Sequence, residues 1–199
     1  MKNTFVLGLT GSIGMGKSTT ANIFREAQIA VWDADAAVHE LYTSDTDTIE
    51  KIFEIAPTSV SVSGVDRKIL SGIIQSDKSL LHKIEDIVHP AIREHRSAFV
   101  EVCNNTDQKL AIVDIPLLYE TEADKWLNAV LVVTIDAETQ MKRVMSRAGM
   151  NEKIFSMMLS RQIPDAEKRK KADYIIETKS IEYVTNQVHN LIKLLVGSR

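Results

Sequence analysis

The stretch "GLTGSIGMGKST" (residues 8–19) carries four glycines within nine residues, which is too many for a regular helix or strand. The apolar run before it, "TFVLGL" (residues 4–9), is typical of a buried strand. In the stretch that follows, "KSTTANIFREAQ" (residues 17–28), apolar residues recur at helical spacing. The glycines are therefore predicted to form a turn between a strand and the N-terminus of a helix.

This turn fits the phosphate-binding pattern G-x-x-x-x-G-K-[ST], with Gly11, Gly16, Lys17 and Ser18 at its fixed positions. Glycine lets successive N–H groups turn inward, and the dipole of the following helix adds positive potential, so the turn forms a nest for an anion. We expect Lys17 to reach the β- and γ-phosphates of a nucleoside triphosphate and Ser18 to ligate Mg²⁺. The alternative is an ordinary glycine turn that happens to precede Lys and Ser. The predicted nucleotide-binding residues are Gly11, Ile13, Gly14, Met15, Gly16, Lys17, Ser18 and Thr19.

The composition is that of an ordinary globular domain, with 199 residues, of which 44% are hydrophobic and 26% charged. A net charge of −3 lacks the basic excess of nucleic-acid-binding proteins, so no nucleic-acid partner is predicted. The single cysteine, Cys103, allows no intrachain disulfide and favours a cytoplasmic location. Because the sequence shows neither an apolar run of membrane-spanning length nor a cleavage signal, we expect no membrane partner and a mature amino terminus. We also expect a monomer or weak homo-oligomer.

Five apolar runs along the chain predict the strands of an α/β fold. After residues 4–9 they are "IAVWD" (29–33), "KLAIVDI" (109–115), "AVLVVTID" (129–136) and "ADYIIE" (172–177). Helical patterns lie between them, so we expect a three-layer α/β/α core with a five-stranded parallel sheet.

Two helical excursions interrupt the predicted core, which comprises residues 1–36, 105–136 and 172–199. Residues 37–104, approximately, contain no convincing strand and are expected to form a helical subdomain, whose last helix Pro90 should break or kink. Residues 137–171, approximately, form the second excursion. This layout is typical of small-molecule kinases, in which one excursion holds the acceptor and the other closes as a lid.

Two carboxylates follow the second predicted strand, in "VWDADAAV" (residues 31–38). Asp33 and Asp35 are two positions apart, so on an extended chain they share one side, at the sheet edge where ligands bind in such folds. One carboxylate is expected to orient or deprotonate an acceptor hydroxyl, and the other to lie near Mg²⁺ or to cap the next helix. The alternative is that both aspartates only cap the helix.

The segment "LAIVDIPLLYE" (residues 110–120) ends an apolar strand with Asp114. We expect this carboxylate to reach Mg²⁺ through water, beside the hydroxyl of the phosphate-binding turn. Pro116 then ends the strand, and Tyr119 and Glu120 are expected to enter the site. A strand-terminating Asp in a simple turn is the alternative interpretation of Asp114.

The second excursion carries "ETQMKRVMSR" (residues 138–147), with Gln140, Arg143 and Arg147 at helical spacing. Arginines on one helix face could neutralise a phosphoryl group in transfer or stack on adenine, although a solvated basic face is the alternative. We interpret the later cluster "EKRKK" (residues 167–171) as solvated. His89, next to Pro90, marks either a kink or a contact to a substrate phosphate.

Taken together, seven strings resemble the dephospho-coenzyme A kinase family, in the family's order and over nearly the whole chain. They are "GLTGSIGMGKS" (8–18), "DAD" (33–35), "GVDRKIL" (64–70), "VHP" (88–90), "DIPLLYE" (114–120), "ETQMKRVMSR" (138–147) and "ADYII" (172–176). The resemblance implies ATP-dependent phosphorylation of the 3′-hydroxyl on the ribose of dephospho-coenzyme A, giving coenzyme A and ADP. It also implies a P-loop kinase core of five parallel strands, a helical substrate subdomain and a lid, with ATP, Mg²⁺ and dephospho-coenzyme A as ligands.

The same resemblance implies roles for individual residues. Asp35 would be the general base, Lys17 would steady the phosphates, and Arg143 or Arg147 would act from the lid. The implied catalytic residues are Asp35, Lys17, Asp33, Arg143 and Arg147. The implied substrate-binding residues are Asp33, Asp35, His89, Leu117, Tyr119, Glu120 and Arg161, and the implied metal ligands are Ser18 and Asp114.

The chain also departs from the family pattern. Ser12 and Met15 stand where the family commonly has Gly and a small residue, at variable positions of the turn. Family members often carry Asn after the last strand, where this chain has Glu177 and Thr178, and this puts an adenine contact there in question.

Two alternative functions are compatible with a phosphate-binding turn. A different small-molecule kinase, such as a nucleoside monophosphate kinase, shares the phosphate-binding turn. A nucleotide-dependent switch or motor shares it too, but the N-K-x-D string of guanine switches and the S-G-G-Q-like signature of transporter ATPases do not occur. The Asp33/Asp35 pair and the arginines of the second excursion favour chemistry on a small acceptor.

Overall fold

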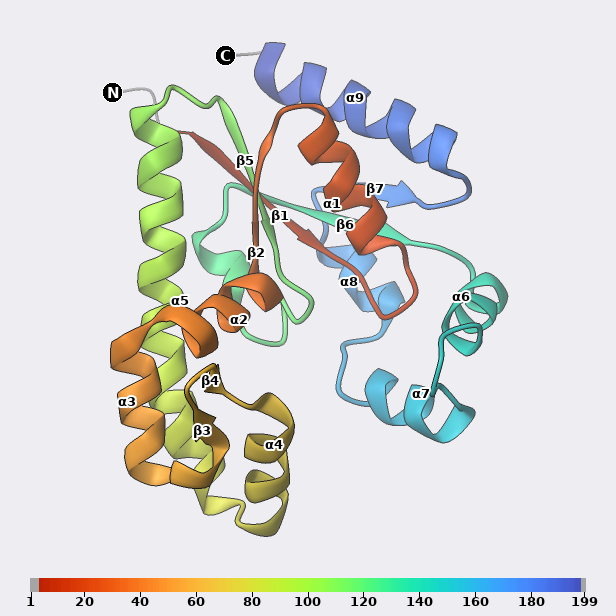
Figure 1. The fold of residues 1–199 in the computed structure, drawn as a ribbon. Coiled ribbons are helices and arrows are strands. Elements are labelled where there is room, and N and C mark those ends of the chain that lie inside the picture. The colour runs from red at the N-terminus through yellow and green to blue at the C-terminus, as the bar shows by residue number, and fades with distance from the viewer. Residues whose placement is uncertain (1–3, 198–199) are drawn as a thin grey trace. The chain divides into compact units, whose positions relative to one another are not determined.

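Five strands form one sheet, as the apolar runs predict (Figure 1). The structure is a computed structural model and describes residues 4–197, so residues 1–3 and 198–199 of the predicted core lie outside the described part. The strand order is β2-β5-β1-β6-β7, and β1 pairs in parallel with both β5 and β6, as β6 does with β7. The strands are β1 (Phe5–Thr10), β2 (Ala30–Asp33), β5 (Leu110–Asp114), β6 (Ala129–Thr134) and β7 (Tyr174–Glu177).

Helices cover both faces of this sheet because its central strands are apolar on both sides. In β6, Leu131 and Val133 belong to the apolar core shared with α1 and α9. The intervening Val130 and Val132 pack on the opposite face, with residues that flank η2 and α8. The three-layer α/β/α arrangement is therefore confirmed. The covering elements are α1 (Lys17–Glu26), the 3₁₀ turn η2 (Ala123–Trp126), α8 (Asp165–Lys171) and α9 (Ile181–Gly197).

The chain divides into two compact units, one of residues 33–101 and the other comprising the sheet and the remaining residues. The second excursion belongs to the sheet-containing unit. It consists of α6 (Ala137–Met145), α7 (Glu152–Leu159) and α8, and we call residues 137–171 the α6–α8 segment. Within the described residues, no helix has both the length and the apolar character that crossing a bilayer requires.

The unit of residues 33–101 has its own apolar core, centred on Leu41, Ile52 and Leu70. It contains a short hairpin that the sequence analysis did not predict, because two strands of two residues each are too short to show alternation. Its elements are α2 (Ala34–Ser44), α3 (Thr46–Ile55), the 3₁₀ turn η1 (Pro57–Ser59), β3 (Val60–Ser61), β4 (Gly64–Val65), α4 (Arg67–Ser76) and most of α5 (Ser79–Asn105).

The expected break at Pro90 was wrong, because α5 runs unbroken through it. Proline removes one backbone donor and so leaves the carbonyl of Asp86 without its helical partner. Both Pro90 and Asp86 are exposed, so water can bind that carbonyl and the helix tolerates the loss. A long amphipathic helix with an apolar face packed on a core is held mainly by that packing.

We expect Leu7→Ala to lower the free energy of unfolding by about 3 kcal/mol, because Leu7 is fully buried in the central strand and a cavity would remain. Leu194→Ala is the matched control, since Leu194 is 56% exposed on α9 and should cost well under about 1 kcal/mol. Denaturant unfolding of both variants checks this. Equal losses would contradict the assignment of β1 to the core.

Candidate active site

The phosphate-binding turn joins β1 to α1, as the sequence predicts. Gly14 and Gly16 have φ angles of 80° and 88°, in the left-handed region that favours glycine. A Cβ on Gly14 would lie 2.6 Å from Val144 Cγ2, so the turn also passes too close to α6 for a side chain. The first helical hydrogen bond runs from the Thr20 N–H to the Gly16 carbonyl at 3.1 Å. The preceding amides of α1 therefore have no helical acceptor and form the positive end of the helix.

Met15 shows how the chain accommodates one departure from the family pattern. Its side chain is buried, and its Sδ accepts a hydrogen bond from the Ile135 N–H at 3.1 Å. The Met15 side chain therefore packs inside the protein against the residue that follows β6. The glycines on either side of it keep their left-handed φ angles.

Lys17 and Asp114 come together at the end of the sheet, with 2.7 Å between Nζ and Oδ1. The Asp114 side chain is only 1% exposed, and that of Lys17 is 16% exposed. Burial of a carboxylate is costly unless a cation or hydrogen bonds compensate it, and the ammonium of Lys17 does so here. Two residues 97 positions apart thus join the start of α1 to the end of β5.

Oxygen ligands for Mg²⁺ are present at this place in the fold. The Ser18 hydroxyl is exposed at the start of α1, and the Asp114 carboxylate ends β5. Mg²⁺ prefers such hard oxygen ligands and usually keeps several waters and substrate phosphates. Among the described residues no cluster of three or more acidic, His or Cys side chains could hold a metal by itself. The residues present thus fit a metal that arrives with a triphosphate.

Arg143 connects the α6–α8 segment to the residue after β7. Its guanidinium donates to Thr178 Oγ1 at 2.8 Å and to the Thr178 carbonyl at 2.6 Å. The Thr178 hydroxyl donates in turn to the Met15 carbonyl at 3.0 Å. Thr178 therefore links an arginine to the phosphate-binding turn.

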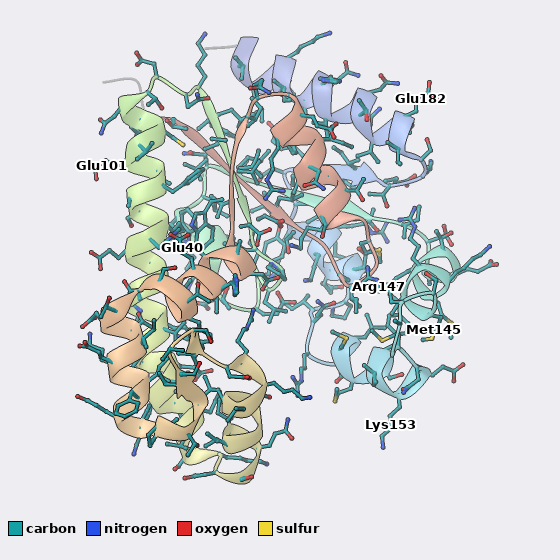
Figure 2. The ribbon with its side chains drawn as sticks, in the orientation of Figure 1. Glu40, Glu101, Met145, Arg147, Lys153 and Glu182 are labelled. Atoms are coloured by element: carbon teal, nitrogen blue, oxygen red, sulfur yellow. The ribbon has the colours of Figure 1, made fainter. Side chains whose placement is uncertain are left out.

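Arg147 was expected on the same helix face as Arg143, and this was wrong, because α6 ends at Met145 and Arg147 lies in the turn that follows (Figure 2). Both arginines nevertheless line one cavity of about 380 Å³ beside the phosphate-binding turn. The rest of its lining is Gly14, Gly16, Thr19, Thr178, Ser180, Ile181 and Val184.

Tyr119 and Glu120, which are expected to contact substrate, lie against the end of the α6–α8 segment in this structure. Glu120 Oε1 accepts from the Ile163 N–H at 2.7 Å and lies 2.9 Å from Lys168 Nζ. Lys171 Nζ lies 5.5 Å from the centroid of the Tyr119 ring. Burial, with smaller effects of nearby acids, raises the pKa of Tyr119 to about 12, so the phenol stays protonated at neutral pH. These two side chains thus hold α8 against the sheet.

Lys168 was interpreted as part of a solvated basic cluster, and this was wrong, because its side chain is fully buried. The charged neighbours of Lys168 on α8 are exposed. The sequence pattern therefore does not distinguish the one lysine that faces Glu120 from the exposed ones. Gln162 was missed altogether. A glutamine in a connection gives no sequence signal for the partner it finds 149 residues away, the Ile13 N–H.

The remaining predicted site residues lie as follows. Asp33 is the N-cap of α2, and its Oδ1 accepts from the Asp35 and Ala36 amides at 2.9 and 3.0 Å. The Asp35 side chain is exposed in the first turn of that helix, and His89 is exposed on α5. Leu117 is 38% exposed after β5, and Arg161 is exposed in the turn after α7.

Comparison with known proteins decides the family. The family model described as dephospho-CoA kinase matches residues 5–182. A dephospho-CoA kinase of Jannaschia sp. (strain CCS1) is 45% identical over 192 residues, which cover 96% of this chain and 97% of the relative. The chain belongs to the dephospho-CoA kinase family. It is therefore a kinase that uses ATP to convert dephospho-coenzyme A to coenzyme A, the final step of coenzyme A biosynthesis.

Solved structures agree with this family assignment. The crystal structure of a Thermus thermophilus protein superposes with a TM-score of 0.83 at 28% identity and covers 97% of this chain and 98% of that one. A dephospho-CoA kinase from Campylobacter jejuni has a TM-score of 0.71 at 28% identity, with 98% of each chain covered. The P-loop kinase fold expected from the resemblance is thereby confirmed.

We expect Lys17→Ala to lose at least about a hundredfold in turnover, because a cation that stabilises developing phosphate charge is removed. The variant should also be less stable, because the buried Asp114 carboxylate would lose the compensating Lys17 ammonium. Lys51→Ala is the control, since Lys51 forms an exposed pair with Asp47 at 2.6 Å and should change neither quantity appreciably. Steady-state rates and thermal melting check this; parent-like turnover in Lys17→Ala would refute the phosphate-binding assignment.

Proposed function

We propose that the phosphate-binding turn holds the ATP triphosphate, and that Asp35 acts as general base on the 3′-hydroxyl of dephospho-coenzyme A. The observation that carries the nucleotide part is the convergence of the turn, the Lys17–Asp114 pair and the two-arginine cavity in one unit. The adenosine moiety is assigned to that cavity, because its size suits a small ligand and arginine stacks on aromatic rings.

The proposed Mg²⁺ site rests on the oxygen ligands of Ser18 and Asp114. When bound with ATP, Mg²⁺ would offset negative charge on the phosphates. Ser18 would hold it directly and Asp114 through water. Lys17 would interact with both the Asp114 carboxylate and the phosphates. Arg143 or Arg147 would offset negative charge at the γ-phosphoryl group.

The proposed reaction is a direct transfer. The 3′-oxygen of the acceptor forms a bond to the γ-phosphorus, the bond from that phosphorus to the β,γ-bridging oxygen breaks, and ADP leaves. The acceptor's proton passes to the Asp35 carboxylate. Asp35 is favoured over Asp33 because the Asp33 Oδ1 already accepts two backbone N–H groups, whereas the Asp35 side chain is exposed. Release of ADP that requires dephospho-coenzyme A, and is not supported by nucleoside monophosphates, tests the acceptor.

We further propose that the enzyme is a cytoplasmic monomer or weak homo-oligomer whose partners are its small substrates, not nucleic acid or a membrane. A net charge of −3 and a single, buried cysteine support this proposal. Its mass in solution, measured by light scattering, tests the oligomeric part.

We expect Asp35→Asn to keep its melting temperature and its affinity for ATP while its turnover falls by about a hundredfold or more, the usual loss for a positioned base. Asp33→Asn is the control, because Asn also caps helices and should preserve α2. Turnover, ATP binding and melting of both variants check the assignment. Full activity in Asp35→Asn with none in Asp33→Asn would reverse the roles of the two carboxylates.

Turnover should cease in excess chelator and return when Mg²⁺ is added, because phosphoryl transfer needs a divalent cation on the phosphates. Ser18→Ala should raise the Mg²⁺ concentration that gives half-maximal rate. Thr19→Ala, which removes the neighbouring hydroxyl, should leave that concentration unchanged. Rates measured against Mg²⁺ at fixed ATP check this, and turnover that persists in chelator would exclude the metal.

A further inference from the structure

Two glutamines bind the two backbone polar groups of a single residue in the phosphate-binding turn. Gln140, on α6, donates from Nε2 to the Ile13 carbonyl at 2.8 Å. Gln162, in the connection between α7 and α8, accepts from the Ile13 N–H at 3.1 Å. Gln140 is buried and Gln162 half-buried, so neither bond lies in open solvent. The two contacts come from two separate parts of the α6–α8 segment, its first helix and the connection before its last helix.

The planarity of the peptide bond extends the effect of Gln140 to the next amide. In a trans peptide unit the C=O and the N–H of the following residue point in opposite directions. Because Gln140 holds the Ile13 carbonyl, the Gly14 N–H is directed away from the Gln140 side chain. Gly14 has a positive φ of 80° and leaves no room for a Cβ beside Val144, so the turn keeps a conformation that only glycine fits.

Gln162 has the complementary effect on the preceding peptide unit. It binds the Ile13 N–H, so the Ser12 carbonyl points the other way, where it accepts from the Met15 N–H at 3.0 Å. The amides of Ile13 and Met15 are therefore used inside the protein. The Gly14 amide and those at the start of α1 remain for an anion.

We propose that Gln140 and Gln162 are positioning residues that together hold Ile13, and that the phosphate-binding turn presents its amides correctly only when both α6 and the α7–α8 connection bind it. The ligand so served is the β- and γ-phosphate part of a nucleoside triphosphate. This inference rests on the proposed function, and it makes the geometry of the turn depend on the segment that also carries Arg143 and Arg147.

The two side chains have opposite hydrogen-bonding roles, which provides a sharp test. Gln140 must donate and Gln162 must accept. In Gln162→Glu a carboxylate oxygen still accepts from the Ile13 N–H. In Gln140→Glu a carboxylate oxygen would face the Ile13 carbonyl, and two acceptors repel each other. Both substitutions add one negative charge next to the same residue, so each controls for the effect of charge on ATP.

The experiment measures ATP binding by calorimetry, and turnover and KM for both substrates, on the full chain well below its melting temperature. We expect Gln140→Glu to weaken ATP binding about tenfold or more, the equivalent of one hydrogen bond, and Gln162→Glu to change it by less than about threefold. KM for ATP should rise in Gln140→Glu while KM for dephospho-coenzyme A stays unchanged in both variants. A general loss of folded enzyme would instead lower the maximal rate and leave both KM values unchanged. Equal ATP affinities in the two variants would overturn the proposal.

A second set of variants keeps the test valid if Gln140→Glu fails to fold. Gln140→Met and Gln162→Met preserve side-chain volume and remove the hydrogen bonds, and each should weaken ATP binding severalfold. The double variant should lose less than the product of the single losses, because both bonds hold one residue. Gln187→Met, on α9, is the control and should bind ATP like the parent. If the parent binds ATP and these variants match it, the proposal fails; if the parent itself does not bind ATP, the proposed function fails.

Discussion

A buried carboxylate requires a cation, and this requirement organises the active end of the sheet. Asp114 is almost fully buried where β5 ends, and Lys17 neutralises it from the first turn of α1. The pair fixes the start of α1 against the sheet, and with it the glycine turn that leads into the helix. Lys17 is also the first residue of α1, directly after the turn. Its ammonium can therefore interact with both the Asp114 carboxylate and a bound phosphate group.

The second constraint is that the turn itself must be held from outside. It has few side chains of its own, so its conformation depends on neighbours that bind its backbone. Thr178 binds the Met15 carbonyl, and Gln140 and Gln162 bind Ile13. All three partners lie far along the chain, in or just beyond the α6–α8 segment. That segment is in turn fastened to the sheet by Glu120, which meets both Ile163 and Lys168.

The sequence predicted what depends on local pattern. The apolar runs located all five strands of the sheet, and the glycine spacing located the turn, because both follow from periodicity and backbone freedom within a few residues. It did not predict the hairpin of β3 and β4 or the continuity of α5 at Pro90, since packing and solvent exposure decide these. It misjudged Lys168 and missed Gln162 because a polar residue's burial depends on a partner distant in sequence. The proposed roles of Asp33 and Asp35, argued from their position after a strand as well as from the family resemblance, and that of His89 stay predictions.

The overall charge of the chain explains why the local arrangement matters so much. A protein with a net charge of −3 does not attract a polyanionic nucleotide by its total field, and salt screens exposed charges beyond about 8 Å under physiological conditions. Attraction must therefore come from groups close to the phosphates: the amides of the turn, the start of α1 and Lys17. Amides contribute only when they point inward, so their orientation affects binding alongside the cations. An enzyme of this composition depends on a fixed backbone conformation in its phosphate-binding turn, and the hydrogen bonds to Ile13 and Met15 fix that conformation.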